Sequence, residues 1–202
     1  MSRLLMQQFA PVDIHVGLHW APFDDTILPP ILDLPEAHPE GANEHVLVYL
    51  PFEHQDQTTA WLQGFADHRF IQYSADVVDE QQGNVTRRKA TISGFKRDLA
   101  ASRGVICNSG FELISECLQW KKPVLTRPLA QQMEQLSNAA ALEQLGYATT
   151  MKSLETKTAR AWLNDMPIAP DVHFKNVAHA LAEWLARGGS RPVTELSKQL
   201  WS

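Results

Sequence analysis

Three polar residues, Asn108-Ser109-Gly110, stand between a short apolar run and a predicted helix, and that helix carries carboxylates at Glu112 and Glu116. The first N–H groups of a helix have no partner inside it, and with the helix dipole they attract anions. Gly110 lacks a side chain, so a phosphate could approach the main chain closely, and Ser109 could add a hydroxyl donor. These residue types predict a site for a diphosphate that needs no metal.

The same residues also fit a simple helix cap. Ser109 and Glu112 have the S-x-x-E spacing of a capping box, in which each side chain accepts a hydrogen bond from the other residue's main-chain N–H. Glu116 lies outside that box, and a second carboxylate four residues after Glu112 mildly destabilises a helix. Glu116 could accept hydrogen bonds from a ribose diol, or it could be a solvated surface residue. The residue pattern alone leaves both interpretations open.

The composition is that of an ordinary globular protein. The 202 residues carry a net charge of −5, which argues against a general binder of nucleic acids or anionic membranes. The apolar runs are too short to span a bilayer, and the N-terminus lacks the apolar region of a signal peptide. Cys107 and Cys117 fit neither a disulfide framework nor a zinc site, so we expect small core residues in a reduced, cytoplasmic protein.

Strands and helices are predicted to alternate over the middle of the chain. The predicted strands are 45–50, 70–74, 84–89, 104–107, 123–127 and 147–150, and the predicted helices are 57–68, 94–102, 109–120 and 131–145. Alternation of this kind produces right-handed βαβ units, and therefore a parallel sheet between helices. The expected fold class is α/β, with a Rossmann-like parallel sheet flanked by helices.

The domain organisation follows from one irregular stretch. Residues 24–44 contain four prolines and little periodicity, and we interpret them as an interdomain linker. Residues 1–23 are too short for a domain and are predicted to be the remnant of a preceding one. The Rossmann-like domain is predicted to cover 45–190 and to end with a helix from Asp171 to the glycine at 188. Residues 191–202 are expected to be a C-terminal tail.

The stretch from Val105 to Ala148 resembles the C-terminal, donor-binding half of GT-B glycosyltransferases, most closely the MurG-like group that uses UDP-N-acetylglucosamine. The shared pattern is, in chain order, Ser109-Gly110, Ser115-Glu116, Pro123, Pro128, Glu134-Gln135 and Asn138-Ala139. Several linked motifs in the right order are more specific than any one of them. The resemblance implies a metal-independent enzyme half that binds a nucleotide-sugar, with UDP favoured, for transfer of a hexose or an N-acetylhexosamine.

The resemblance also implies roles for individual residues. The main chain of Ile92 would recognise the uracil edge, Glu116 the ribose hydroxyls, and Gln135, with Gln131 or Gln132, the donor sugar. Phe111 and Leu129 would shape the pocket. The implied donor-binding residues are Ile92, Asn108, Ser109, Gly110, Phe111, Glu116, Leu129, Gln132, Glu134 and Gln135.

Two features depart from the family pattern. Glu134-Gln135 stands where the family has paired glutamines, which leaves the identity of the sugar open. The glycine-rich loop expected after the first strand of the donor domain is replaced by PFEHQD at 51–56. His54 in this loop could meet a donor phosphate or sugar, although an exposed loop histidine is the commoner case.

The expected chemistry is incomplete within this chain. The helix start at Ser109 would stabilise the departing nucleoside diphosphate, but the resemblance places the catalytic base in the other domain. It requires no cofactor and no metal, and it allows for a partner polypeptide that carries the acceptor domain, or for self-association. One alternative is a non-catalytic nucleotide-binding or interaction module. Another is an α/β hydrolase with Ser109 as nucleophile, although Cys107 and Phe111 stand where such an elbow needs glycines.

Overall fold

A computed structural model describes residues 13–34 and 44–202, and it divides the chain into two compact units. The first unit combines the N-terminal segment up to residue 33 with residues 174–202, and the second is formed by residues 34–173. The second unit contains the predicted site. Its elements are β3 (His45–Tyr49), α2 (Gln55–Gln63), β4 (Phe70–Ser74), β5 (Glu80–Gln82), β6 (Val85–Lys89), α3 (Ile92–Ala100), β7 (Ser102–Asn108), α4 (Phe111–Gln119), β8 (Val124–Arg127), α5 (Met133–Leu145), β9 (Thr149–Thr150) and α6 (Thr156–Asn164).

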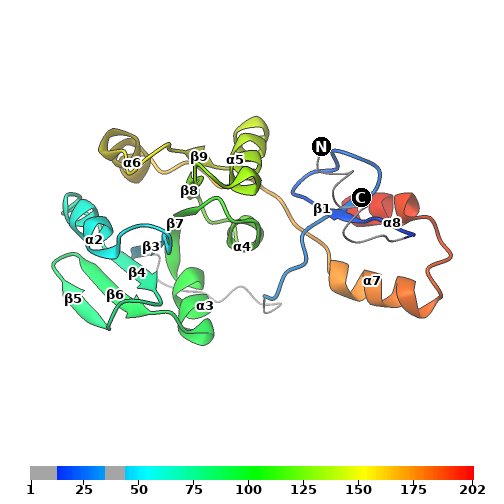
Figure 1. Ribbon diagram of the computed structural model, residues 1–202, viewed down its shortest axis with the longest axis horizontal. Coiled ribbons are helices and arrows are strands. Elements are labelled where there is room, and N and C mark those ends of the chain that lie inside the picture. The colour runs from blue at the N-terminus through cyan, green and yellow to red at the C-terminus, as the bar shows by residue number, and fades with distance from the viewer. Residues whose placement is uncertain (1–12, 35–43) are drawn as a thin grey trace. The chain divides into compact units, whose positions relative to one another are not determined.

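The seven strands of this unit form one sheet in the order β5-β6-β4-β3-β7-β8-β9. All neighbouring strands are parallel except β5, which pairs antiparallel with β6. The central strands β3, β4 and β7 are almost completely buried, as expected for strands that have helices on both faces. This confirms the predicted α/β class with a parallel sheet flanked by helices (Figure 1).

The helices cover the two faces of the sheet in different groups. Alternate strand residues such as Val46 and Ile106 share one core cluster with residues of α2 and α6, among them Leu62 and Trp162. On the opposite face, Tyr49 and Tyr73 pack edge-on against Phe95 of α3. Since side chains of a strand alternate between faces, these two sets identify the two layers of helices around the sheet.

The first unit is small and has its own apolar cluster. It contains β1 (Gly17–Leu18), β2 (Ile27–Leu28), α7 (Val177–Ala186) and α8 (Val193–Trp201), and the two short strands pair in parallel. Leu28 packs there with Val177, Leu196 and Leu200. The side chains of Ser197 and Trp201 both donate hydrogen bonds to the carbonyl oxygen of Ile27, at 2.7 and 2.8 Å.

This division differs from the predicted one at both ends of the chain. The predicted tail 191–202 is helical from Val193 on, because Leu196 and Leu200 lie on a buried side of the helix and pack with Leu28 of β2. The helix predicted from Asp171 begins at Val177, where the Asn176 side chain accepts the N–H of His179. Residues 24–33 of the predicted linker belong to the first unit. Residues 1–12 and 35–43 of the predicted remnant and linker lie outside the described residues.

Two elements of the second unit were not predicted. Strand β5 has the sequence EQQ, and its hydrogen bonds to β6 define it rather than any apolar pattern. Helix α6 carries Ala159, Trp162 and Leu163 on its buried side. The remaining elements are present with shifted ends; the helix predicted at 57–68 begins at Gln55, with His54 at the N-cap.

Candidate functional site

The order of the strands creates a crevice beside the first strand of the sheet. From β3 the chain moves outward to β4 on one side, and it later returns to β7 on the other side. Ligands of open α/β sheets bind outside the carboxyl ends of the strands at such a switch point. The segments that leave these ends are residues 50–54 after β3 and the turn 108–110 after β7, so the predicted diphosphate turn lies at this position.

Side chains from neighbouring elements hold the turn in place. The Asn108 side-chain amide donates to the carbonyl oxygen of Arg127 at 3.1 Å, and Ser109 Oγ lies 2.9 Å from Thr126 Oγ1. Asn138 of α5 donates to the carbonyl oxygen of Ser109 at 3.0 Å. Asn108, Ser109 and Asn138 are all buried. The turn is therefore fixed against β8 and α5 before any ligand binds.

Helix α4 begins without a side-chain cap. Its N-cap is Gly110, in an extended conformation with φ −74°, and no side chain caps the helix start. The capping box of Ser109 and Glu112 is thus wrong, because the fully buried Ser109 hydroxyl is engaged with Thr126 instead. A Cβ built on Gly110 would meet no atom within 4 Å. The start of α4 therefore combines an uncapped positive end with open space over its glycine.

Glu116 lies on α4 beside the start of α3. Its carboxylate forms an ion pair with the Lys96 ammonium group, and the two side chains are 13% and 24% exposed. Lys96 follows Ile92 by one helical turn. The ion pair therefore connects Glu116, predicted to bind the ribose, with the helix whose first residue is predicted to contact the uracil. Ile92 itself is 80% exposed and leaves its surroundings open. Sequence reasoning missed Lys96, because no local pattern links it to Glu116.

The predicted sugar-binding residues lie around the loop between β8 and α5. The buried Gln135 accepts the N–H of Leu129 at 3.1 Å with its side-chain oxygen, and its amide group donates to Gln132 Oε1 at 2.9 Å. Both hydrogen bonds of the Gln135 side chain are thus made within the loop between β8 and α5. Glu134 and Gln132 are exposed, and Phe111 and Leu129 are partly exposed. The roles that the resemblance implies for these residues remain predictions.

A second ion pair crosses the same edge of the sheet. Arg127, the last residue of β8, contacts Glu53 of the loop after β3 through its guanidinium group, and the side chains are only 19% and 15% exposed. Glu53 belongs to the segment that replaces the glycine-rich loop. His54, which follows it, is exposed and stands at the N-cap of α2 without a side-chain cap bond.

A buried carboxylate in the last turn of α3, that of Asp98, connects this helix to the sheet. Asp98 Oδ2 accepts the Tyr73 hydroxyl at 2.7 Å and pairs with Arg88, while its Oδ1 accepts from Arg97 Nε at 3.0 Å. Burial, followed by the hydrogen bond to Asp98, raises the pKa of Tyr73 to about 12. Tyr73 therefore remains a neutral hydrogen-bond donor at physiological pH, and the cluster positions the helix rather than exchanging protons.

The hydrolase alternative finds no support in the geometry of Ser109. Its hydroxyl is fully buried and lies 2.9 Å from Thr126 Oγ1, and no histidine in the described parts of the chain forms a hydrogen bond with it. The thiols are equally inert: burial raises the pKa of Cys107 to about 12 and that of Cys117 well above its ordinary value. Both cysteines are completely buried core residues. Among residues 13–34 and 44–202, no cluster of three or more histidine, cysteine or acidic side chains could hold a metal ion.

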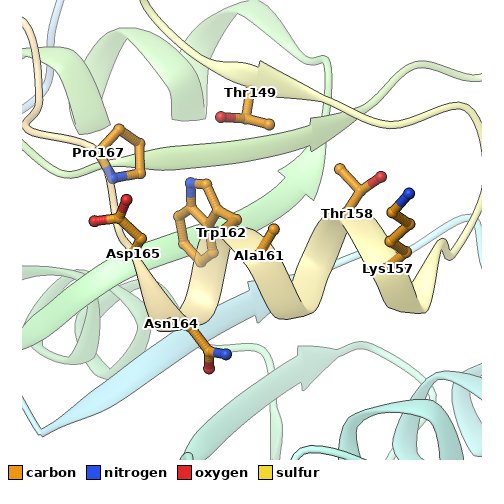
Figure 2. Close-up of a pocket in the computed structure, with 8 residues that line it drawn as sticks. All are labelled: Thr149, Lys157, Thr158, Ala161, Trp162, Asn164, Asp165 and Pro167. Carbon is orange, nitrogen blue, oxygen red and sulfur yellow. The ribbon is translucent and has the colours of Figure 1, made fainter.

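A hollow lies elsewhere on the second unit. It measures about 820 Å³ and lies along α6 and β9 (Figure 2); its lining residues are Thr149, Lys157, Thr158, Ala161, Trp162, Asn164, Asp165 and Pro167. None of the predicted donor-binding residues contributes to it. Its lining comes from α6, β9 and the segment after α6, whereas the predicted residues gather at the carboxyl edge of β3, β7 and β8.

A doubly wound parallel sheet with a ligand crevice at its switch point defines a class of nucleotide-binding α/β proteins. Within that class, the profile of a family described as "Glycosyl transferase family 1" matches residues 21–167. The match covers most of the chain, and the chain belongs to this glycosyltransferase family. The family that the sequence resemblance predicted is thereby confirmed.

Curated relatives match the chain over part of their length. A protein of Clostridium botulinum (strain 657 / Type Ba4) is 33% identical over 106 residues; it is described as a "UDP-N-acetylglucosamine--N-acetylmuramyl-(pentapeptide) pyrophosphoryl-undecaprenol N-acetylglucosamine transferase". The alignment covers 50% of this chain and 29% of that relative. The chain therefore spans well under half the length of such relatives.

Solved glycosyltransferase structures share the fold. The glycotransferase of kitacinnamycin has a TM-score of 0.51 and 16% identity, over 88% of this chain and 50% of that one. The Streptomyces sp. SF2575 glycosyltransferase SsfS6, solved with thymidine diphosphate, has a TM-score of 0.50 and 12% identity, over 93% and 52%. At these identities the likeness concerns the fold, which is that of a GT-B glycosyltransferase domain.

The structure brings most of the predicted residues to one edge of the sheet. Ser109, Gly110 and Phe111 adjoin the turn after β7, and Glu116 and Ile92 lie on the adjoining helices α4 and α3. The loop from Leu129 to Gln135 follows β8, the next strand. Sequence reasoning missed Arg127 and Thr126; both end β8, and the only local signal was that they precede Pro128.

Proposed function

We propose that residues 34–173 bind a nucleoside-diphosphate sugar, with a UDP-linked donor favoured, and form the donor half of a metal-independent glycosyltransferase. The observation that carries this proposal is the uncapped start of α4 at the switch point, with Gly110 bare and the turn already fixed by Asn108, Ser109 and Asn138. Such a site presents the first main-chain N–H groups of α4 to a diphosphate on a turn that is already in place.

The same helix start would assist the chemical step. When the bond between the anomeric carbon and the β-phosphate oxygen breaks, its electron pair remains on the diphosphate, where negative charge grows. Preorganised N–H groups and the helix dipole stabilise this charge without having to reorient. The side chain of Ser109 is directed to Thr126, and the Gly110 N–H donates to the carbonyl oxygen of Asn108 at 2.8 Å. We therefore assign the phosphate contact to the main-chain N–H groups in the first turn of α4, over the bare Gly110.

The ribose is assigned to Glu116. A carboxylate accepts two hydroxyl hydrogen bonds from a vicinal diol, and the ion pair with Lys96 holds this carboxylate in position. Ile92, one turn before Lys96, would place its exposed segment against the base. The sugar would then extend toward Gln132, Glu134 and Gln135, which follow β8.

The acceptor and the catalytic base belong to a second domain in this proposal. The chain spans 29% of its curated relative and about half of the solved structures. A partner polypeptide, or a longer form of this chain, would supply the acceptor side. Within the described ranges 13–34 and 44–202, no helix is long and apolar enough to cross a membrane.

The alternative function is nucleotide binding without turnover. The specific observation in its favour is the Glu53 carboxylate at the edge where the family has a glycine-rich loop, since a fixed negative charge opposes a diphosphate. A module of this kind would bind the nucleotide weakly and transfer no sugar. Transfer assays with an acceptor domain present would separate the two functions.

Calorimetric titration with UDP, 2′,3′-dideoxy-UDP, GDP and ADP tests the donor-site proposal. We expect UDP to bind in the presence of EDTA, and Glu116→Ala to weaken it about 10-fold or more, because hydrogen bonds to a charged group contribute about 1.5–3 kcal/mol. The dideoxy analogue should bind wild type and Glu116→Ala alike. Glu112→Ala is the matched control, since Glu112 is an exposed carboxylate one turn earlier on the same helix.

The proposal fails if no nucleotide binds at millimolar concentration, or if Glu112→Ala and Glu116→Ala weaken UDP equally. Equal losses would mean that the effect of Glu116 is a general change of charge or helix stability. Circular dichroism of each variant verifies that α4 remains folded despite the loss of the Lys96 ion pair.

A further inference from the structure

The ion pair of Glu53 and Arg127 is held in a fixed position at the carboxyl edge of the sheet. Gln55 donates from its side-chain amide to the carbonyl oxygens of Leu50 and Glu53, at 2.9 and 2.8 Å, and this fixes the loop after β3. Arg127 is anchored as the last residue of β8, where its carbonyl oxygen accepts from Asn108. Both charged side chains are more than four-fifths buried.

The pair spans the end of the strand that carries the proposed diphosphate site. β7 lies between β3 and β8 in the sheet (Figure 1), and Asn108 pairs with Arg127 in register. Two strand spacings amount to roughly 9–10 Å, and Glu53 and Arg127 together bridge this distance. Their contact therefore crosses the carboxyl end of β7, next to the turn Asn108-Ser109-Gly110.

The two charges have opposite effects on a diphosphate. A guanidinium group presents several N–H donors in a planar fork that suits phosphate oxygens, whereas a fixed carboxylate repels them. Arg127 also has unused capacity, because its Nε atom is buried and has no hydrogen-bond partner among the described residues. A buried donor without a partner carries a desolvation cost, and a phosphate oxygen bound at this edge would remove it.

We infer that Arg127 binds the diphosphate of the donor and that Glu53 competes with the diphosphate for it, so that the ion pair opens when the nucleotide binds. This inference rests on the proposed function and names a residue of the same site. The pair takes the place of the glycine-rich loop: an arginine supplies the attraction, and Glu53 limits it. The site then discriminates strongly by the number of phosphate charges.

The experiment compares uridine, UMP and UDP on wild type, Glu53→Gln, Arg127→Gln and the double variant, by calorimetry at low salt. Glu53→Gln should bind UDP about 10-fold tighter than wild type and leave uridine unchanged. Arg127→Gln should weaken UDP about 10-fold or more, because it leaves a bare carboxylate at the site. The double variant should bind UDP better than Arg127→Gln, since that carboxylate is gone.

Glu80→Gln is the matched control. Glu80 of β5 pairs with Arg87 of β6 at 2.9 Å, and the strands β6, β4 and β3 separate β5 from β7, so its loss should change no affinity. Arg127→Lys, which keeps the charge but not the fork, should retain part of the UDP binding. If Arg127→Gln does not fold, Glu53→Gln and the uncharged double variant still carry the test.

The outcomes separate the inference from the proposed function. If wild type binds UDP, and if neither Glu53→Gln nor Arg127→Gln changes the ratio of the UDP and uridine affinities, the inference is overturned and the proposed function is not. Absence of all nucleotide binding in wild type and in Glu53→Gln overturns both. UDP binding that emerges only in Glu53→Gln supports the inference and identifies Glu53 as the inhibitory charge.

Discussion

Substitution of Gly104 by alanine should destabilise the second unit without changing the donor edge. A Cβ at this position would lie 2.8 Å from Met166 Sδ and 2.9 Å from the Trp162 ring, closer than ordinary carbon contacts. Trp162 is 3% exposed and belongs to the main core cluster, so the ring cannot move outward freely. Overpacking of this kind costs about 1–3 kcal/mol.

Part of that cost is offset, because alanine has fewer unfolded conformations than glycine, an effect of about 0.4–1 kcal/mol. The expected net loss is about 1–2 kcal/mol. For a unit of this length (residues 34–173), such a loss lowers the melting temperature by about 2–8 °C. Urea denaturation followed by circular dichroism, together with calorimetric melting, would measure both quantities.

A double-mutant cycle identifies the cause of the loss. Met166→Ala removes the nearer of the two contacts, so Gly104→Ala should cost about 1 kcal/mol less in that background than in wild type. An unchanged or raised stability of Gly104→Ala would refute the reasoning, because it would show that β7 and α6 can separate enough to admit a methyl group. Additive losses in the double variant would exclude Met166 as the obstacle.

Three further substitutions or conditions test the core beneath the site. Burial lowers the pKa of His45 below 6.5, so the unfolded chain binds a proton that the folded chain excludes, and the urea midpoint should fall as the pH drops below 6.5; His45→Gln should flatten this dependence. Asp98→Asn should cost about 2–3 kcal/mol in urea denaturation, because Arg88 loses a buried partner, whereas Glu44→Gln, in an exposed ion pair, should have little effect. Lys122→Met should cost about 2–3 kcal/mol in thermal melting, because two main-chain carbonyl oxygens lose the ammonium donor that contacts each at 2.7 Å.

Apolar patterns within single strands and helices predicted most elements of the second unit. The strands around Val46 and Ile71 are buried on both faces, and a continuous apolar run expresses this directly in the sequence. Elements defined by hydrogen bonds to a neighbour were missed, as with the polar strand β5. The helix α6 was missed as well, although Ala159, Trp162 and Leu163 give it a buried side.

At the candidate site, too, the sequence predicted local features but not contacts between distant segments. The turn at Ser109 and Gly110 was predicted, because a glycine and a polar residue between a strand and a helix form a local pattern. The capping box was wrong, because Thr126 on the next strand competes for the Ser109 hydroxyl. The ion pair of Glu53 and Arg127 joins segments far apart in the sequence, and only the order of the strands brings them together.

The two buried cysteines allow opening of the structure at the proposed donor site to be measured by thiol labelling. Cys107 immediately precedes Asn108 on β7, and both thiols are completely buried with raised pKa values. A thiol reagent attacks only the exposed thiolate, so labelling must wait until the strand separates from its neighbours. The natural sequence therefore allows labelling rates to follow how often this strand opens, and how far a bound nucleotide suppresses that opening, without any introduced probe.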